Sequence, residues 1–237
     1  MDIYKLTHLG ILKTLWINFK VLPLSQAVRF PILLARNVRI GACGKGCISL
    51  PDGGKMQVGF HGYGGSVPQK SQLYIRGKIV LRGKGFHVFG LGTVIKIDRS
   101  GILDIGNNFS CHGGNTFLVN KSIVIGEDNM WSFDIVTMDT DAHMMFDGEG
   151  NFLNPNKEVR IGNGVWVGCR NTILKGASIP DGCVMGSGGI VTKKLEKSGS
   201  VYCGNRLVRE GVIWSRKRNL EGTDPEEVYQ KAISQNR

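Results

Sequence analysis

The sequence predicts an all-β fold, a solenoid of short parallel strands, from three observations. Glycine makes up 34 of 237 residues, about 14% against a usual share of ~7%, while proline is scarce at 7. An aliphatic side chain recurs at each sixth position through residues 159–194. The repeat is absent for about twenty residues after Met138 and then returns in full. Many tight corners and a fixed six-residue period are typical of a hexapeptide β-helix and not of a helix bundle.

Composition and charge narrow the class further. Hydrophobic residues make up 41% and charged residues 21%, a globular mixture that argues against long disorder. The net charge is +11, and the first hundred residues alone carry about +12. A basic half suits nucleic acid, an anionic membrane or a phosphorylated ligand. The chain has no paired metal-ligand Cys and His, no aromatic RNA platform and no basic heptad helix, so we expect no nucleic-acid partner.

Residues 1–37 are expected to form an N-terminal helical segment. The apolar stretch 9–34 is interrupted by lysine, arginine and proline, and its longest uncharged run is far shorter than the ~20 residues of a membrane span. Within it, apolar side chains follow a helical period and form one stripe: Ile11, Leu12, Leu15, Trp16 and Phe19. Two placements of this stripe stay open: packed on the main body, or lying on a membrane surface with the neighbouring lysines at the headgroups.

Cysteine usage and the start of the chain suggest the compartment. The six cysteines are scattered and give no second ligand pair for a metal cluster. The first residues lack the n-region and cleavage site of a secretory signal. We therefore expect reduced thiols, no bound metal and a cytoplasmic protein, with peripheral contact of residues 9–34 with the inner face of the cell membrane as the second possibility.

Residues 38–205 are expected to form the solenoid. Between Val38 and Ile105 the apolar residues come in short strand-like bursts separated by glycine. A six-residue period matches neither a helix nor the alternation of one strand, so it predicts a short strand, a corner and a repeat, with each sixth side chain inside a narrow prism. The sixfold positions are Ile161, Val167, Ile173, Ile179, Met185 and Val191.

The period is interrupted upstream, and this predicts a loop. Ile105, Cys111, Phe117 and Ile123 keep phase, after which the pattern shifts by two residues to Ile125. Residues 138–158 are polar, contain glycine and carry no period. We expect them to leave the solenoid as a loop, and such insertions often lie on the binding face.

Residues 206–237 are expected to form a C-terminal cap. Asp224-Pro225-Glu226-Glu227 has an N-cap residue, a proline at the first helical position and acids in the first turn. The predicted short helix runs to about Ser234 and covers the open end of the prism.

Three segments carry a resemblance to a known family: MDTDAH (138–143), VRIGNGVWVGCRNTILKGASIPDGCVMGSGGIVTKK (159–194) and CGNRLVRE (203–210). They resemble hexapeptide-repeat acyltransferases, left-handed parallel β-helix enzymes that use acetyl-CoA. Within them they are most similar to the maltose/galactoside acetyltransferase and polysaccharide O-acetyltransferase group. The resemblance implies a homotrimer with active sites between neighbouring prisms. It also implies acetyl transfer to a sugar or glycan hydroxyl, which we expect to serve surface polysaccharide synthesis.

The resemblance implies a general base on the loop. His143 occupies the place of the family's catalytic histidine, and an ordinary imidazole (pKa ~6.5) accepts a proton from a sugar hydroxyl at neutral pH. Asp141, two residues earlier, is expected to fix the tautomer of that imidazole or to stabilise its charged form. Asp139 and His112 are expected at the acceptor, and solvated loop acids or a corner histidine are the alternatives for these residues.

Catalysis also needs a donor for the oxyanion of the tetrahedral intermediate. In the family a backbone N–H just after the Trp-x-Gly step supplies it, which corresponds to Cys169 after Trp166 and Gly168 here. We expect the thiol itself to be incidental. Trp166 resembles the tryptophan that lines the family's cleft, next to cofactor and acceptor, and packing at a subunit contact is its alternative.

The resemblance also implies where acetyl-CoA binds. The pantetheine arm is expected along the backbone near small residues, here Gly186 and Ser187. Four cations stand near the end of the repeat, where the family binds the adenosine phosphates, and an ordinary solvated basic face is the alternative: Lys193, Lys194, Arg206 and Arg209. The family's Gly-Asn-Pro-Ala before a basic residue is reduced here to Gly204-Asn205 followed directly by Arg206, which departs from the pattern at this point.

Three other functions remain open on the sequence. One is N-acetyl transfer to an amino sugar, and another is a non-catalytic solenoid scaffold, which has no need of the Asp-Thr-Asp-Ala-His loop. The third is a zinc-dependent lyase on the same solenoid, which needs three converging histidines. The chain has five, none paired at short spacing: His8, His61, His87, His112 and His143.

Overall fold

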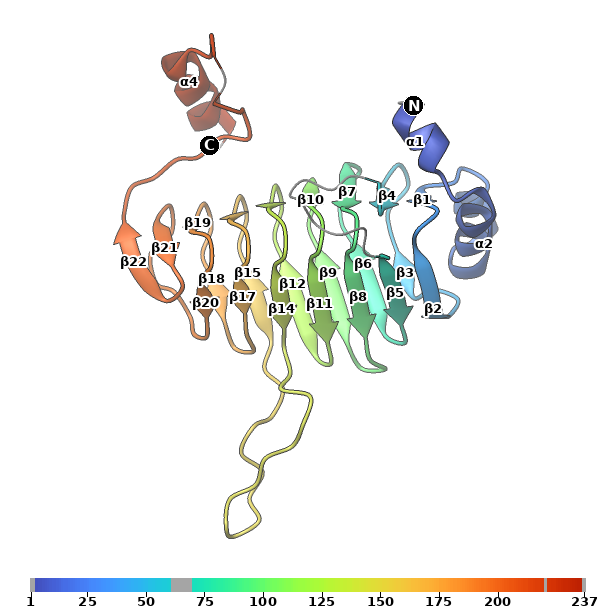
Figure 1. Cartoon of the computed structure of the whole chain (residues 1–237), viewed down its shortest axis with the longest axis horizontal. Helices are drawn as coiled ribbons and strands as arrows, with labels where there is room; N and C mark the ends of the chain where they lie inside the picture. Colours follow the sequence, from blue (N-terminus) through green and yellow to red (C-terminus); the bar gives the residue numbers. More distant parts are fainter. Residues whose placement is uncertain (1–2, 61–69, 220, 236–237) are drawn as a thin grey trace.

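The computed structural model describes residues 3–60, 70–219 and 221–235, and the chain winds there as a left-handed parallel β-helix (Figure 1). Successive strands enter three sheets in turn, so that each coil adds one strand to each face of a prism. We number these faces sheets I, II and III in the order in which the chain visits them. The fold class predicted from the sequence is confirmed.

The strands of sheet I are β1 (Ile32–Leu34), β4 (Lys55–Val58), β7 (Phe86–Phe89), β10 (Phe109–Cys111), β13 (Met130–Trp131), β16 (Trp166–Val167), β19 (Val184–Met185), β21 (Val201–Cys203) and β22 (Arg206–Arg209). Those of sheet II are β2 (Arg39–Cys43), β5 (Gln72–Ile75), β8 (Val94–Ile97), β11 (Thr116–Val119), β14 (Val136–Met138), β17 (Thr172–Ile173) and β20 (Ile190–Val191). Those of sheet III are β3 (Ile48–Ser49), β6 (Lys78–Leu81), β9 (Ile102–Ile105), β12 (Ser122–Ile125), β15 (Val159–Ile161) and β18 (Ser178–Ile179).

The six-residue period places the core. All six sixfold side chains are at most 1% exposed, and they stack between coils, Ile161 on Ile179 and Val167 on Met185. Partners 18 residues apart make one coil of three hexads. Ile105 instead pairs with Ile125, 20 residues later, so two additional residues in that coil explain the phase shift in the sequence.

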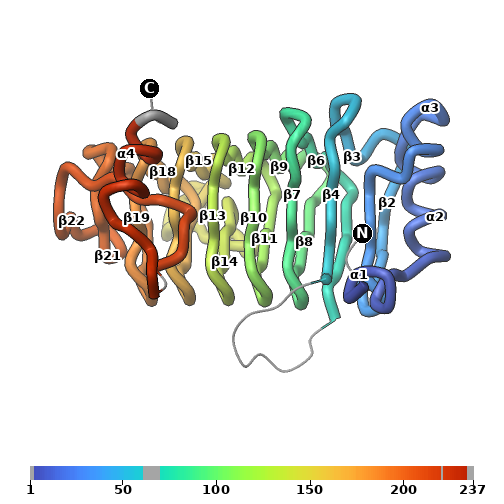
Figure 2. The backbone as a smooth tube through the Cα atoms, turned by 90° about the horizontal axis from the view of Figure 1, so that it is seen from above, coloured from blue at the N-terminus to red at the C-terminus, as the bar shows by residue number. Residues whose placement is uncertain are grey.

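Three helices border the N-terminal end of the prism: α1 (Ile3–His8), α2 (Ile11–Val21) and α3 (Leu24–Ala27) (Figures 1 and 2). Helix α2 ends before Pro23, because the residue ahead of a proline is pushed out of the helical region, and Leu22 has ψ of 158°. Strand β1 lies inside the segment 1–37 that the sequence assigns to helix. The sequence marks this strand only by three apolar residues after Pro31. Such a short run cannot be distinguished from the helical pattern that precedes it.

Both predicted appendages are present. Residues 138–158 leave the solenoid between β14 and β15 and project from its body (Figure 1). Helix α4 (Pro225–Gln235) begins as predicted, with Asp224 Oδ1 accepting the N–H of Glu226 at 2.9 Å. It stands apart from the prism, on the side of the C-terminal coils (Figure 1), and the end that it was expected to cover is bordered by β22, the one antiparallel strand among the named strands of the described chain. No helix in the described residues has the length and apolarity needed to cross a bilayer.

Candidate active site

Two corners of the prism carry the residues that the sequence singles out. Corner I–II is the turn from each strand of sheet I into sheet II, and corner II–III is the turn from sheet II into sheet III. Because the coils stack, each corner forms a ridge along the prism, and residues distant in sequence fall into line. Cys169 and Ser187 lie on corner I–II in neighbouring coils, and the loop with His143 leaves from corner II–III.

The backbone of corner I–II is held tightly between coils. Asn171 Nδ2 donates hydrogen bonds to the carbonyl oxygens of Gly168 and Gly186, both at 2.8 Å. A Cβ atom added to Gly168 would lie 2.7 Å from the Met185 carbonyl oxygen and 2.8 Å from Ser187 Oγ. Glycine at position 168 is therefore required by the close approach of the next coil.

Corner I–II offers two backbone donors. Cys169 and Ser187 directly follow the two glycines, and neither backbone N–H donates a hydrogen bond to any residue that the structure describes. Free N–H groups at a tight turn are suited to a carbonyl oxygen or an oxyanion. The thiol of Cys169 is half-buried and forms no disulfide. That the backbone of Cys169, and not its sulfur, takes part in the chemistry stays a prediction.

Trp166 lies on sheet I, in the strand before this corner, and contacts a residue that the sequence analysis missed. Its side chain is 40% exposed on β16, and the ring of Trp214 lies against it with centroids 5.9 Å apart. Trp214 Nε1 donates to the Gly164 carbonyl oxygen at 2.5 Å, and Arg216 Nη2 donates to that of Asn129 at 2.8 Å. The C-terminal tail thus runs back across sheet I. Its contacts bridge 50 and 87 residues, so no local spacing signals them.

His143 is held by its backbone near the base of the loop. Its N–H donates to the Asp141 carbonyl oxygen at 2.7 Å, and its own carbonyl oxygen accepts from Asn154 Nδ2 at 2.8 Å. The residue is exposed, and its imidazole makes no hydrogen bond within the described part of the chain. The ring is therefore available to a bound molecule.

The carboxylate of Asp141 belongs to a network other than the expected one. Its Oδ2 lies 2.5 Å from Lys175 Nζ and accepts from Asn154 Nδ2 at 3.0 Å. These hydrogen bonds, first that of Lys175 and then that of Asn154, lower the pKa of Asp141 from its ordinary value. No contact joins this carboxylate to the His143 ring among the described residues. Asp141 contacts His143 only through the backbone hydrogen bond described above, and the sequence analysis missed both Lys175 and Asn154.

Asp139 has a structural role in this chain. Its side chain is completely buried, and its carboxylate accepts the backbone N–H groups of Asn120, Lys121 and Ser122 at 2.6–2.8 Å. Three charge-assisted hydrogen bonds fix the corner of the preceding coil. A buried carboxylate that accepts three hydrogen bonds has no surface left for an acceptor sugar. The expected role of Asp139 in acceptor binding is therefore corrected to a role in holding the fold.

The remaining predicted residues lie on both corners and on strand β22. His112 directly follows β10 and is half-buried on corner I–II, two coils before Cys169, and therefore not beside the loop of His143. Lys193 and Lys194 are exposed at corner II–III of the last coils, whereas the other two cations are exposed on β22: Arg206 and Arg209. The four cations line two sides of the C-terminal end and do not form one cluster.

One described chain presents the two halves of the candidate site at different corners. The strands of sheet II separate corner I–II, with its N–H donors and Trp166, from corner II–III, with His143. The loop also projects away from the body (Figure 1). Within the described ranges no group of three or more His, Cys, Asp or Glu is placed to hold a metal ion, and His61 lies outside those ranges.

Fold and corners together define a left-handed parallel β-helix of the hexapeptide-repeat class, and comparison with known proteins specifies the group. No protein-family model matches the chain. It is 32% identical over 116 residues to galactoside O-acetyltransferase of Escherichia coli K12, covering 46% of this chain and 54% of the relative. It is 31% identical over 134 residues to polysialic acid O-acetyltransferase of Escherichia coli O1:K1 / APEC, covering 55% of this chain and 43% of the relative.

A solved structure agrees with these relatives in fold. The polySia-specific acetyltransferase NeuO matches with a TM-score of 0.52 and 22% identity, over 83% of this chain and 99% of that chain. The chain spans about half the length of the two curated relatives it matches. In sequence and fold it is similar to the hexapeptide-repeat acetyltransferase group, and the resemblance found in the sequence is confirmed.

Proposed function

We propose that the protein is an acyl-CoA-dependent O-acetyltransferase, which moves an acetyl group from acetyl-CoA to a sugar hydroxyl in the synthesis of a surface polysaccharide. The observation that carries the proposal is its identity of 31–32% to two O-acetyltransferases named for galactoside and polysialic acid substrates. The exposed imidazole of His143 and the free N–H of Cys169 supply the two groups that this reaction needs. Six free cysteines are consistent with a cytoplasmic site of action.

The proposed active form is a homotrimer. The loop that carries His143 exposes five large apolar side chains, each 46–65% exposed: Met144, Met145, Phe146, Phe152 and Leu153. An exposed apolar group of this size on a projecting loop is typical of a protein interface. A second copy that receives this loop beside its corner I–II would bring His143 of one chain to Cys169 of the next. This arrangement joins the two halves that a single chain keeps apart.

His143 is proposed as the general base of direct transfer. The sugar oxygen forms a bond to the acetyl carbonyl carbon while its proton passes to the imidazole. The developing oxyanion accepts the N–H of Cys169. The carbon–sulfur bond then breaks, and the sulfur leaves as the CoA thiol with the proton that His143 held. No bond to the sulfur of Cys169 is needed.

The residues around corner I–II fit acetyl-CoA as the donor. The N–H of Ser187, beside Gly186, is available to an amide carbonyl of the pantetheine arm, and Trp166 with Trp214 offers an apolar surface on sheet I. The exposed cations at the C-terminal end suit the phosphates. We assign these contacts to Lys193, Lys194, Arg206 and Arg209, and because the two pairs line different sides of one chain, we propose that each bound CoA meets one pair from each of two neighbouring chains.

A CoA-release assay with acetyl-CoA and a panel of sugars, oligosaccharides, nucleotide sugars and amino sugars tests the function. Mild alkali identifies the product, because it removes an O-acetyl ester and leaves an N-acetyl amide. His143→Ala should lower the rate about 10²–10⁴-fold with acetyl-CoA affinity kept. His8→Ala, an exposed histidine on α1, is the matched control and should keep full activity. A loss below about tenfold in His143→Ala removes His143 from the role.

A further inference from the structure

Helix α2 is apolar on two sides. One side packs on the solenoid through Ile17 and Val21, both fully buried. The same face carries Thr14 and Asn18, whose side chains bind the first strand of the solenoid. Asn18 Oδ1 accepts the N–H of Ile32 at 3.1 Å while its Nδ2 donates to the same residue's carbonyl oxygen at 2.7 Å, and Thr14 Oγ1 accepts the N–H of Leu34 at 3.1 Å. These bonds satisfy an edge strand that would otherwise expose its backbone. The packed face of α2 therefore combines apolar burial with polar side chains that bind the edge strand.

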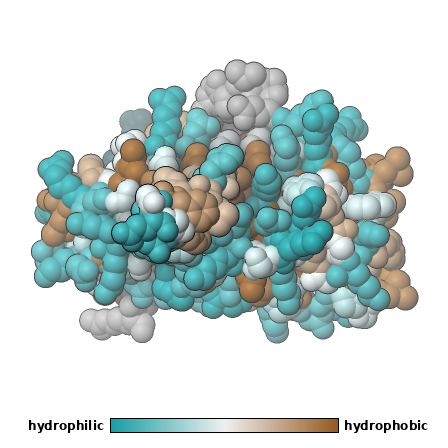
Figure 3. Space-filling model, turned by 90° about the horizontal axis from the view of Figure 1, so that it is seen from below, coloured by the Kyte–Doolittle hydropathy of each residue, from teal (hydrophilic) through white to brown (hydrophobic). Residues whose placement is uncertain are grey.

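Five other large apolar side chains of α2 point to solvent. The stripe seen in the sequence is 38–80% exposed, with Leu12 at the upper limit. Phe30, in the turn after α3, extends it through an edge contact with Phe19, centroids 6.0 Å apart. Figure 3 shows apolar atoms gathered at this end of the molecule. We call this surface the cap face: Ile11, Leu12, Leu15, Trp16, Phe19 and Phe30.

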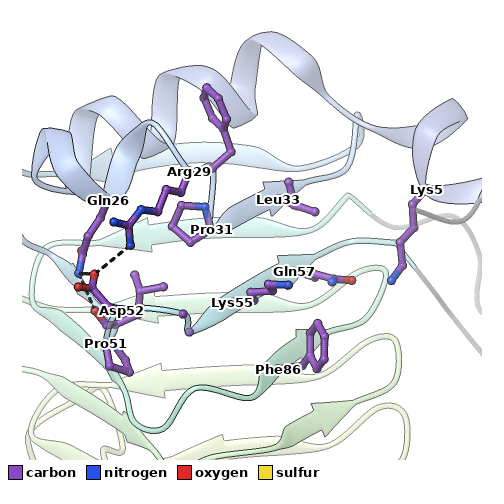
Figure 4. Close-up of a pocket in the computed structure, with 14 residues that line it drawn as sticks. Lys5, Gln26, Arg29, Pro31, Leu33, Pro51, Asp52, Lys55, Gln57 and Phe86 are labelled. Atoms are coloured by element: carbon purple, nitrogen blue, oxygen red, sulfur yellow. Dashed lines mark hydrogen bonds and ion pairs between the residues drawn. The ribbon is translucent and has the colours of Figure 1, made fainter.

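The charge around the cap face is predominantly positive. No Asp or Glu occurs between positions 3 and 51 of the sequence, while seven lysines and arginines do. Beside the cap face, between α1, α3 and sheet I, lies a pocket of about 630 Å³ with an apolar floor and cations from Lys5, Arg29 and Lys55 (Figure 4). Asp52, 3.8 Å from Arg29, is the one acid among its described lining residues.

We propose that the cap face docks on an anionic lipid bilayer. The apolar side chains enter the headgroup region, α2 lies in the plane of the interface, and Lys5, Lys20 and Arg29 meet lipid phosphates, with the pocket beside α3 receiving a headgroup. The charge argues against a second copy as the occupant. Two cap faces brought together would oppose cations to cations, with no acid between positions 3 and 51 to pair them. The inference does not depend on acetyl transfer.

Co-sedimentation of the full-length protein with vesicles tests this. We expect pelleting with phosphatidylcholine vesicles that contain phosphatidylglycerol, much less with phosphatidylcholine alone, and release at high salt, because screening shortens the reach of the charges. Replacing Lys5, Lys20 and Arg29 by Gln should lower partitioning about a hundredfold, at roughly fivefold for each cation. The matched control replaces three exposed cations of the middle coils, Lys96, Arg99 and Lys121, and should bind as wild type.

A second variant pair tests the apolar part. Leu12→Gln, Leu15→Gln and Phe19→Gln together keep helix propensity and charge, and should abolish pelleting while circular dichroism stays unchanged. Ile102→Gln, Ile190→Gln and Val208→Gln, likewise exposed, form the control set and should still pellet. Wild-type protein that stays in the supernatant with every vesicle overturns the proposal. Equal vesicle binding by cap and control variants also overturns it. The same holds if the cap variant still binds vesicles and sedimentation velocity shows that it has only lost self-association, because the cap face would then be an interface between copies.

Discussion

Lys175 Nζ lies 2.5 Å from Asp141 Oδ2, and this ion pair joins the first residues of the loop to the corner of the following coil. The same ammonium donates to the Asn154 carbonyl oxygen at 3.1 Å, so one lysine holds both sides of the loop where it leaves the solenoid. The Lys175 side chain is only 17% exposed. His143 lies between these attachment points, and we infer that Lys175 positions it.

Removing this lysine should affect activity more than stability. Lys175→Met keeps the length of the side chain and removes its charge, and we expect kcat to fall about ten- to a hundredfold, because a displaced catalytic group loses its alignment. The melting temperature should change by at most a few degrees, since a partly exposed ion pair contributes ~0–1 kcal/mol. Lys157→Met, an exposed lysine at the other end of the loop, is the control. Lys175→Arg should recover part of the rate, and an unchanged kcat in Lys175→Met would show that Lys175 does not position His143.

The ion pair between Lys175 and Asp141, which we call the loop anchor, depends on pH with a defined sign. The pKa of Asp141 is lowered, chiefly by Lys175, so the carboxylate's contribution is complete above its unfolded pKa and is lost as pH falls through the lower folded value. The anchor should therefore hold at neutral pH and fail only in acid, below about 4. Carboxyl ¹³C NMR should show Asp141 titrating at a higher pH in Lys175→Met than in wild type. Coincident titration curves in the two proteins would contradict the assignment.

The solenoid could be predicted from the sequence because its determinants are local and repeated. A six-residue period fixes which side chains enter the prism. The six side chains at the sixfold positions between 161 and 191 are buried as that period requires. Asp139 was misjudged because a polar residue in a loop pattern gives no sign of the three backbone N–H groups that surround its carboxylate. The partners of Asp141 and Trp166 come from other coils and from the tail. Sequence spacing does not encode such contacts.

The N-terminal helix shows a different limit. The helical period of its apolar stripe was correct, but a period alone does not say which face packs. The stripe is exposed because the helix packs through another face, where Ile17 and Val21 are buried and Thr14 and Asn18 bind the edge strand β1. The sequence analysis did not find this strand. Polar residues such as these mark a packing face only through their backbone partners on β1, and helical spacing does not reveal those partners.

Two substitutions at Cys169 separate the roles of its sulfur and its N–H. Cys169→Ala removes the thiol and keeps the N–H, so activity should stay within a few-fold of wild type. Cys169→Pro removes the N–H, which donates to no described residue, and should lower kcat about 10²–10³-fold. Arg170 has φ of 56°, as the second central residue of a type II turn has. Cys169 is then the first central residue, a position at which such turns accept proline. A thermal melt checks that both variants fold, and an inactive, folded Cys169→Ala would point instead to an acyl-cysteine.

Mixing two inactive variants tests whether the site forms between chains. His143→Ala lacks the base and keeps corner I–II, whereas Cys169→Pro keeps the base and lacks the donor. If each site takes His143 from one chain and Cys169 from its neighbour, chains co-assembled in equal amounts contain intact sites at about one quarter of positions. Activity should therefore return to about a quarter of the wild-type level, while either variant alone stays inactive. Sedimentation velocity should show a trimer throughout. If the site lies within one chain, the mixture stays as inactive as its components, because every chain then carries one defect in its own site.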